Sequence, residues 1–253
     1  MLLPIGWFSA LSQGFVVDGA DFDGTNDYMT RGAGLSGAAD SKLLTIAGWI
    51  FRRGTMTTQR ILGSATSVGG SGTNQARVGS GTLDQLFINW LNTSGAQVLS
   101  MNSGATTIPS SAWTWFAISV DMDDAAKRHV YFNDTSVINV STYTVGETLD
   151  FTKADWSIGA SPDGTLKLNG GLADLNMWSA YINLSTEANR RLFFSASGKP
   201  VNPAAAIAAL GTPLFRFHLD DGEAAANFAT NDGGGGNFSV SGSLSTTGTS
   251  PSD

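Results

Sequence analysis

Short apolar stretches recur along this chain, separated by Gly, Asn, Asp and Ser. The stretch WTWFAISV alternates most clearly, because Phe116 and Ile118 would fall on one side of an extended chain and Trp115 on the other. Apolar runs of four to eight residues with turn residues between them predict strands. The expected strands are 27–30, 43–51, 60–63, 86–91, 97–101, 113–120, 129–132, 136–140, 155–159, 171–178 and 237–241.

Two later stretches are typical of short helices. Ser185 can cap a helix that runs to about Phe194, with Glu187 near its positive end. The run Pro203 to Leu210 has proline at a helix start, several alanines, and Gly211 as a stop. We therefore expect one or two short helices near the C-terminal part.

Composition agrees with a strand-rich fold. Charged residues are 14% of the chain and 31 of its 253 residues are glycine, whereas about 25% charged and about 7% glycine are usual. We predict an all-β protein, a two-sheet antiparallel sandwich. Its expected parts are an apolar N-terminal arm (1–17), the sandwich (18–194) and a C-terminal extension (195–253) with a short helix, one or two strands and a flexible Ser/Thr tail.

The formal net charge is −7, which disfavours nucleic acid and anionic membrane surfaces as partners. The chain has no cysteine, which excludes disulfides and cysteine-ligated metals. It has no run of 18 apolar residues that would span a bilayer. Residues 1–17 carry no Lys or Arg, so an arm of the mature protein is favoured over a signal peptide.

Four blocks, in order, resemble the laminin-G-like, concanavalin A-like jelly-roll domains. They span roughly residues 18–194, and the resemblance implies a jelly-roll sandwich. The blocks are Phe22–Tyr28, Leu44–Phe51, Trp113–Asp121 with Val130–Asp134, and Trp156–Gly159 with Gly170–Leu175 and Leu184–Ser185.

A narrower resemblance lies further along the chain. Residues 181–191, Gly198–Val201 and Ser250–Asp253 are similar to laminin-G-like proteins encoded among the structural genes of tailed bacteriophages and prophages. It implies a virion accessory protein, decorating the head or attached to the tail, with other virion proteins as partners. The alternative is a secreted or cell-surface, carbohydrate-binding lectin-like module, and the expected location is accordingly the virion or the extracellular space.

Catalysis has little support in the residues. Glycoside hydrolysis uses two carboxyl groups that flank the scissile bond, but the chain has only Glu147, Glu187 and Glu223, far apart in sequence, and no strand alternates Glu with Asp. A serine hydrolase needs a histidine base, and His129 and His218 accompany no Gly-x-Ser-x-Gly elbow. We predict that the protein is not an enzyme.

Two kinds of binding site are expected instead. Asp18, Asp21, Asp23 and Asp27 lie within ten residues, and calcium takes oxygen ligands. The resemblance implies a calcium near this segment with a late-strand partner, so Asp23, Asp27 and Asp174 are the metal candidates, and no other cofactor is expected. Glycan candidates near strand ends or loops are Trp90, Asn92, Tyr143 and Asp163, each of which could equally be a packing or turn residue.

The terminal segments also carry large side chains that a free tail would rarely contain. We predict a homo-oligomer, a trimer or dimer, with one or both terminal segments in the contact; the alternative is that these segments finish the chain's own sandwich. These side chains are Trp7, Phe8, Phe15, Phe215, Phe217, Phe228 and Phe238.

Overall fold

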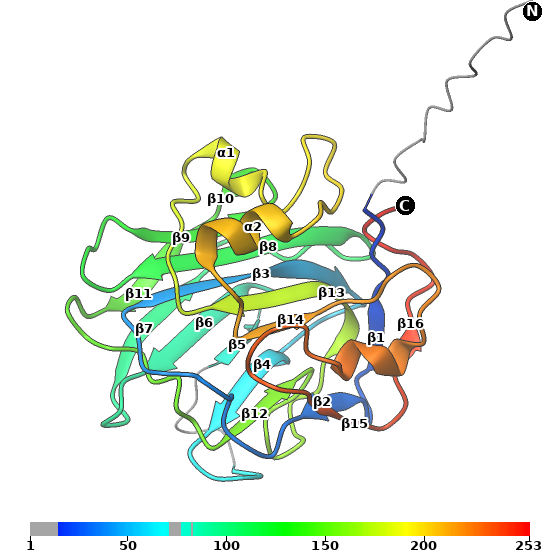
Figure 1. Ribbon diagram of the computed structural model, residues 1–253, viewed down its shortest axis with the longest axis horizontal. Helices are drawn as coiled ribbons and strands as arrows, with labels where there is room; N and C mark the ends of the chain where they lie inside the picture. Colours follow the sequence, from blue (N-terminus) through cyan, green and yellow to red (C-terminus); the bar gives the residue numbers. More distant parts are fainter. Residues whose placement is uncertain (1–14, 71–76, 82) are drawn as a thin grey trace, which may run out of the picture.

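Two antiparallel sheets pack face to face in the computed structural model, which describes residues 15–70, 77–81 and 83–253 (Figure 1). The all-β sandwich predicted from the sequence is confirmed. Its strands are β1 Ala20–Asp23, β2 Tyr28–Thr30, β3 Leu43–Arg52, β4 Arg60–Ala65, β5 Arg77–Ser80, β6 Leu86–Leu91, β7 Gln97–Asn102, β8 Trp113–Asp121, β9 Arg128–Phe132, β10 Thr135–Ser136, β11 Asn139–Tyr143, β12 Asp155–Ile158, β13 Asn169–Trp178, β14 Phe215–Phe217, β15 Ser239–Ser241 and β16 Ser245–Thr246.

The first sheet has the order β10-β9-β8-β3-β13-β1-β16, and β14 also pairs with β13. The second sheet has the order β11-β7-β6-β5-β4-β12-β2-β15. Strands distant in the sequence are neighbours in both sheets, as when β1 lies between β13 and β16. This non-local pairing is typical of a jelly roll and cannot be read from strand positions alone.

The main core lies between the two sheets. Alternate residues of each strand point into it, so that Phe116 and Ile118 of β8 share one buried cluster with Ile88 and Trp90 of β6. Their side chains are at most 1% exposed. Burying a large apolar side chain contributes roughly 1.5–3 kcal/mol, which makes this layer the main source of stability.

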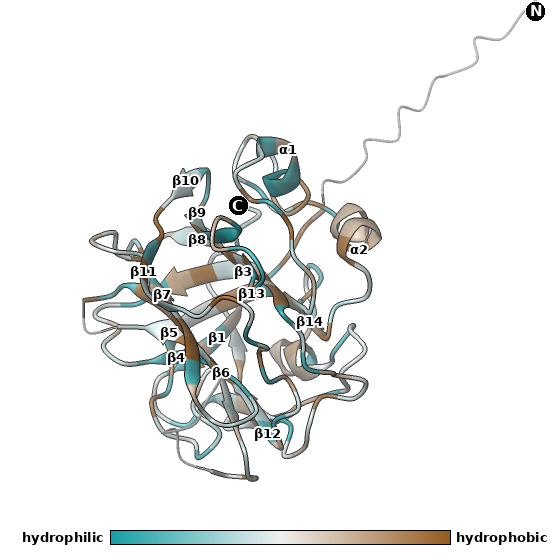
Figure 2. Ribbon diagram, turned by 90° about the vertical axis from the view of Figure 1, so that its left-hand side faces the viewer, coloured by the Kyte–Doolittle hydropathy of each residue, from teal (hydrophilic) through white to brown (hydrophobic). Residues whose placement is uncertain are grey.

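A second apolar cluster covers the outer face of the first sheet. Trp115 and Trp49 point away from the main core and contact Phe194, with ring centroids 4.5 and 6.4 Å apart. The segment that supplies Phe194 also contains the helices α1 Glu187–Arg190 and α2 Ala204–Leu210. Figures 1 and 2 show both helices on this side, away from β4, β5 and β6. The outer face of the first sheet is therefore closed to ligands here.

The two predicted helices are present but short. α1 starts after Thr186, not Ser185, and α2 starts after Pro203 and ends at Gly211 with φ 84°. Gly211 suits that end because φ > 0 costs glycine little. A single turn of 3-10 helix, η1 Ala225–Ala229, follows. No helix in the described ranges is long and apolar enough to cross a membrane.

Residues 195–253 are built into the sandwich. β14 and β16 join the first sheet and β15 joins the second. Phe215, Phe217 and Phe228 are fully buried, and Phe238 is 6% exposed. The segment predicted as an extension with a flexible tail thus contributes strands to both sheets, and these four rings finish the chain's own core.

The predicted arm lies almost wholly outside the described residues, because it comprises residues 1–17 and the description begins at residue 15. Trp7 and Phe8 fall in that part, and Phe15 packs on the outer cluster. The homo-oligomer expected from these segments stays a prediction.

Candidate functional site

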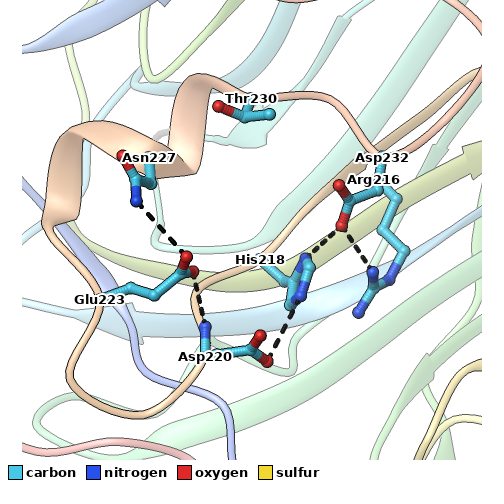
Figure 3. A pocket seen from close by; sticks show the side chains of 7 residues that line it. All are labelled: Arg216, His218, Asp220, Glu223, Asn227, Thr230 and Asp232. Atoms are coloured by element: carbon cyan, nitrogen blue, oxygen red, sulfur yellow. Dashed lines mark hydrogen bonds and ion pairs between the residues drawn. The ribbon is translucent and has the colours of Figure 1, made fainter.

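A hollow lies beside β14, and we call it the β14 pocket (Figure 3). Its volume is about 540 Å³. All seven side chains that line it are polar, and they come from one stretch that runs from β14 to the loop after η1. They are Arg216, His218, Asp220, Glu223, Asn227, Thr230 and Asp232.

β14 aims this lining by simple alternation. Phe215, Phe217 and Leu219 are fully buried and point into the core, so the residues between them, Arg216 and His218, point to the other side. The backbone amide of Asp232 donates to the carbonyl of Arg216 over 3.0 Å, which holds the returning chain against β14. The pocket is therefore anchored on a core strand.

Asp232 links the two basic side chains at the back of the pocket (Figure 3). Its Oδ2 lies 2.8 Å from Nη1 of Arg216 and 2.8 Å from Nδ1 of His218. On its other edge His218 places Nε2 3.6 Å from Oδ1 of Asp220. His218 thus stands between two carboxylates, and its side chain is 15% exposed.

The front of the pocket is held by Glu223. Its Oε2 accepts a hydrogen bond from the amide of Asp220 over 3.0 Å, and its Oε1 accepts one from Nδ2 of Asn227 over 3.4 Å. The second bond connects the loop to η1, because Asn227 belongs to η1. Asn227, Thr230 and Asp220 remain exposed, so their polar atoms are accessible to a ligand.

Asp174 lies behind Arg216 at an irregular point of β13. Its φ of 41° is unusual for a residue other than glycine, and the pairing of β13 with β3 shifts between Ala173 and Asn176. Gly48 faces this bulge, since a Cβ there would lie 3.1 Å from Cα of Leu175. Oδ1 of Asp174 is 3.4 Å from Nε of Arg216. Burial raises the pKa of Asp174, and the charge of Arg216 opposes that rise.

The chemistry available in the β14 pocket is hydrogen bonding. Small-molecule sites are usually lined mainly by apolar and aromatic side chains, whereas this one offers carboxylate, amide, hydroxyl, imidazole and guanidinium groups. Carboxylates accept only, guanidinium groups donate only, and amides do both. Such a lining suits a small ligand that carries many hydroxyl groups.

Two of the predicted glycan residues serve the structure. Trp90 is fully buried between the sheets and donates from Nε1 to the carbonyl of Asp150 over 2.9 Å, so its ring offers no face to a sugar. Asn92 orders a turn, because its Oδ1 accepts from the amides of Ser94 and Ala96. Trp90 is a core residue and Asn92 a turn residue, which are the alternatives that the sequence left open.

The other two lie apart from each other. Tyr143 is half-buried on β11, and its hydroxyl donates to the carbonyl of Asp121 over 2.6 Å. Burial raises the pKa of Tyr143. Asp163 lies in a turn, where Oδ1 accepts from the amide and hydroxyl of Thr165. The structure does not bring the four predicted glycan residues together.

The three predicted metal ligands do not converge either. Oδ1 of Asp23 accepts from the amides of Thr25 and Asn26, and Oδ1 of Asp27 accepts from that of Ser243. Asp23 faces Asn169, five residues before Asp174, which is roughly 16 Å along a strand. In the described residues no three His, Asp or Glu side chains are grouped as metal ligands. A calcium held jointly by Asp23, Asp27 and Asp174 does not fit this geometry.

Sequence reasoning does not find the pocket residues, because it treats 195–253 as an extension of the sandwich. The signal was present in FRFHL, where apolar and polar residues alternate from Phe215 to Leu219. That alternation predicts a half-buried strand with Arg216 and His218 on its open side. The polar residues that follow Leu219 then lie beside this strand and line the pocket.

Comparisons with solved structures find chains similar to this one. A putative carbohydrate-binding protein from Bacteroides ovatus superposes with a TM-score of 0.61 at 14% identity, over 92% of this chain and 60% of that one. Domain 4 of an extracellular arabinanase from Geobacillus stearothermophilus, in complex with arabinotriose, gives 0.46 at 14% identity, over 68% of this chain and 75% of that one. A heptameric SAP-like pentraxin from Limulus polyphemus gives 0.47 at 13% identity, over 66% and 78%.

The chain thus spans about 60% of the length of the Bacteroides protein. No curated protein matches the sequence. A family model does match, over residues 23–186, which is most of the sandwich but stops before β14. The laminin-G-like, concanavalin A-like resemblance of the sequence is confirmed by this match, and the protein belongs to the concanavalin A-like lectin/glucanases superfamily.

Proposed function

We propose that the chain is a non-catalytic carbohydrate-binding module of the lectin type, and that its β14 pocket holds a sugar by hydrogen bonds to hydroxyl groups. The observation that carries the proposal is the lining of this pocket, in which all seven side chains are polar. A pocket of about 540 Å³ is within the usual range for small ligands, roughly 300–1,000 Å³. Its mix of acceptors and donors matches the alternating hydroxyl and ring oxygens of a sugar.

The comparisons support the same class of ligand. The matching family is named for lectins and glucanases, and the Bacteroides structure is described as a putative carbohydrate-binding protein. Its similarity at 14% identity concerns the fold, so the proposal for this chain depends on the pocket itself.

We favour binding over hydrolysis because two of the three carboxylates in the β14 pocket already have structural partners. Asp232 is shared by Arg216 and His218, and Glu223 holds the amides of Asp220 and Asn227. A glycosidase needs one carboxyl group free to give a proton and a second free to attack or to activate water. Catalysis would require breaking these contacts.

The proposed setting is extracellular, where lectin-like modules meet glycans. The comparisons give no support to a virion role, to docking on other virion proteins or to a place on a phage head or tail. The lectin-like alternative inferred from the sequence is therefore the one that we propose here.

A glycan array followed by calorimetry tests the proposal. We expect at least one neutral glycan to bind, and we expect Asn227→Ala or Thr230→Ala to weaken it about tenfold, since loss of one or two hydrogen bonds to a ligand is worth about 1.4 kcal/mol. Asn26→Ala is the matched control, because Asn26 is also an exposed asparagine but lies outside the pocket. Binding that both pocket variants leave unchanged would overturn the assignment, and release of reducing ends would overturn the non-catalytic role.

A further inference from the structure

A second pocket lies on the other sheet, and we call it the Phe87 pocket. It has a volume of about 280 Å³ and opens on the outer face of β4, β5 and β6. Its lining differs from that of the β14 pocket because it combines two arginines with an aromatic ring. The lining residues are Thr58, Arg60, Arg77, Ser80, Gly81, Phe87 and Asn89.

The strand register places this lining. Gly79 of β5 pairs with Arg60 of β4 on one side and with Phe87 of β6 on the other. Arg77, two residues before Gly79, pairs with Asn89. Both arginines, Phe87 and Asn89 therefore share the outer face, because residues two apart on a strand point the same way.

The two guanidinium groups gather at the aromatic ring. Cζ of Arg60 lies 5.1 Å and Cζ of Arg77 lies 5.5 Å from the centroid of Phe87. Position 79 has no side chain between Arg60 and Phe87, and a Cβ there would overlap the carbonyl oxygen of Gln59. The arrangement brings two positive charges together at one small hollow.

Neither arginine has a carboxylate partner. The ion pairs in the structure involve other basic side chains, and residues 1–14, 71–76 and 82, outside the described ranges, include no Asp or Glu. Arg77 is held by an amide instead, since Oδ1 of Asn89, in the orientation that satisfies its neighbours, accepts from Nη2 and Nε over 3.1 and 3.0 Å.

Arg60 is the more unusual of the two. It is only 6% exposed, and its Nε is buried without a hydrogen-bond partner in the described structure. Burial lowers the pKa of Arg60 to about 10, the charge of Arg77 adds to this, and the charge of Asp163 opposes it. Burial also lowers the pKa of Arg77. A buried, unpaired charge costs free energy, and a bound anion would offset that cost.

We propose that the Phe87 pocket binds the carboxylate of an acidic sugar, a hexuronate, between Arg60 and Arg77, with the sugar ring against Phe87. A carboxylate is planar and accepts two parallel hydrogen bonds from a guanidinium group. Thr58 lines the same hollow and is exposed, whereas Ser80 is fully buried and its hydroxyl donates to the carbonyl of Met56. An inorganic anion would bind the arginines but would leave the ring of Phe87 without a partner.

The size and charge of the protein favour a single acidic residue over a long polyanion. The pocket of about 280 Å³ lies just below the usual range for small ligands, roughly 300–1,000 Å³, which limits the occupant to one sugar ring. The net charge of −7 repels an extended chain of negative charges. One terminal carboxylate avoids most of that repulsion.

Calorimetry and amide chemical shifts test this proposal on the full chain. The probes are D-glucuronate and D-galacturonate, their neutral counterparts D-glucose and D-galactose, and inorganic phosphate. We expect at least one hexuronate to bind at least tenfold more tightly than its neutral counterpart and than phosphate, with a shift of the Gly81 amide. Equal binding of the neutral sugar or of phosphate would overturn the proposal.

Arg77→Gln is the main variant, because Arg77 is half-buried whereas Arg60 is almost enclosed. We expect it to remove the preference for the hexuronate at an unchanged Tm. Arg128→Gln is the matched control, since Arg128 is also half-buried and lies 5.3 Å from the ring centroid of Tyr143, but on the other sheet. Retained preference in Arg77→Gln, or its loss in Arg128→Gln, would overturn the assignment.

The assignments of the β14 pocket and the Phe87 pocket can be tested independently. Asn227→Ala alters the β14 pocket and should leave hexuronate binding unchanged, while Arg77→Gln should leave binding of a neutral glycan in the β14 pocket unchanged. Loss of hexuronate binding on Asn227→Ala would contradict the Phe87 assignment and move the acidic sugar to the β14 pocket.

Discussion

The backbone amide of Val17 donates a hydrogen bond to Oγ of Ser252 over 2.8 Å, and the same hydroxyl lies 3.3 Å from the carbonyl oxygen of Val17. This contact joins residues 235 positions apart. Close by, Nε1 of Trp113 donates to the carbonyl of Thr249 over 3.1 Å. The backbone amide of Thr247 donates to the carbonyl of Gly19 over 2.9 Å. The last residues of the chain thus close the edge of the first sheet beside β1.

Deleting residues 247–253 should therefore destabilise the sandwich. The deletion removes the bonds to Val17, Trp113 and Gly19, and each hydrogen bond contributes about 1 kcal/mol. We expect the free energy of unfolding in urea to fall by about 2–3 kcal/mol, with greater exposure of Trp113 to a fluorescence quencher. Ser252→Ala alone should cost about 1 kcal/mol. An unchanged urea midpoint in the deletion would show that the segment is a free tail.

The second prediction concerns the buried ion pair between Asp150 and Lys153. The side chains are 10% and 2% exposed, and Nζ of Lys153 donates to Oδ2 of Asp150. Burial alone would raise the pKa of Asp150, but the ammonium of Lys153 and the bonds from Thr152 override it and hold the pKa below its ordinary value. Lys153→Met leaves a buried carboxylate unpaired, so we expect the free energy of unfolding at pH 7 to fall by about 3–5 kcal/mol.

The double variant Asp150→Asn, Lys153→Met is the control for that result. It removes both charges and retains a side chain of similar size at each position, so most of the loss should be recovered. Chemical denaturation of the two variants and the wild type measures the difference. A double variant as unstable as Lys153→Met would show that packing of the lysine stem, not the unpaired charge, causes the loss.

A third prediction concerns acid stability at the β9–β10 hairpin. Asp134 binds Arg191 through Oδ1 and Oδ2 and also Arg190, which joins the hairpin to α1. The hydrogen bonds from Arg191, with the one from Arg190, lower the pKa of Asp134 although burial opposes this. A lowered carboxyl pKa stabilises the fold above the unfolded value of about 3.9 and loses this effect as the pH falls below it.

Asp134→Asn should thus cost stability at pH 7 and much less at pH 3. The carboxylate is 46% exposed, so solvent screening keeps the expected loss near 1 kcal/mol. Thermal unfolding of both proteins between pH 3 and pH 7 measures the gap. Asp123→Asn serves as the comparison, because Asp123 pairs only with the exposed Lys42. A gap that is constant with pH would contradict the ion-pair explanation.

The sequence predicted the strands whose apolar alternation is regular and the sandwich that they form. It does not predict β1, β5, β14 and β16, which are only two to four residues long. β5 reads RVGS, and only Val78 marks it as a strand. Its neighbours β4 and β6 supply the pairing that makes it one. Local pattern cannot report such tertiary pairing.

The candidate sites were harder to predict for a related reason. Trp90 is a candidate glycan-binding residue in the sequence because a polar turn follows it. In the structure, the alternation of β6 points the ring of Trp90 into the core and that of Phe87 to the outer face. A shift of one position along a strand reverses the face. The arginines of the Phe87 pocket are 17 residues apart in the sequence, and only the pairing of β4 with β5 brings them together.

Trp90→Phe tests whether Trp90 contributes to the stability of the core or to ligand binding. The variant loses the bond from Nε1 to the carbonyl of Asp150 and part of a ring that packs 5.0 Å from that of Phe151. We expect the free energy of unfolding to fall by about 2–3 kcal/mol, because a buried acceptor loses its partner and a small cavity forms. Trp113→Phe is the matched control, because Nε1 of Trp113 also donates to a carbonyl but the ring is only half-buried. This control should lower the free energy of unfolding by about 1 kcal/mol.

Binding of a neutral glycan and of a hexuronate should be unchanged in Trp90→Phe at 15 °C, where the folded state still dominates. A selective loss of glycan affinity at unchanged stability would instead make Trp90 a sugar-stacking residue and would require the second sheet to open.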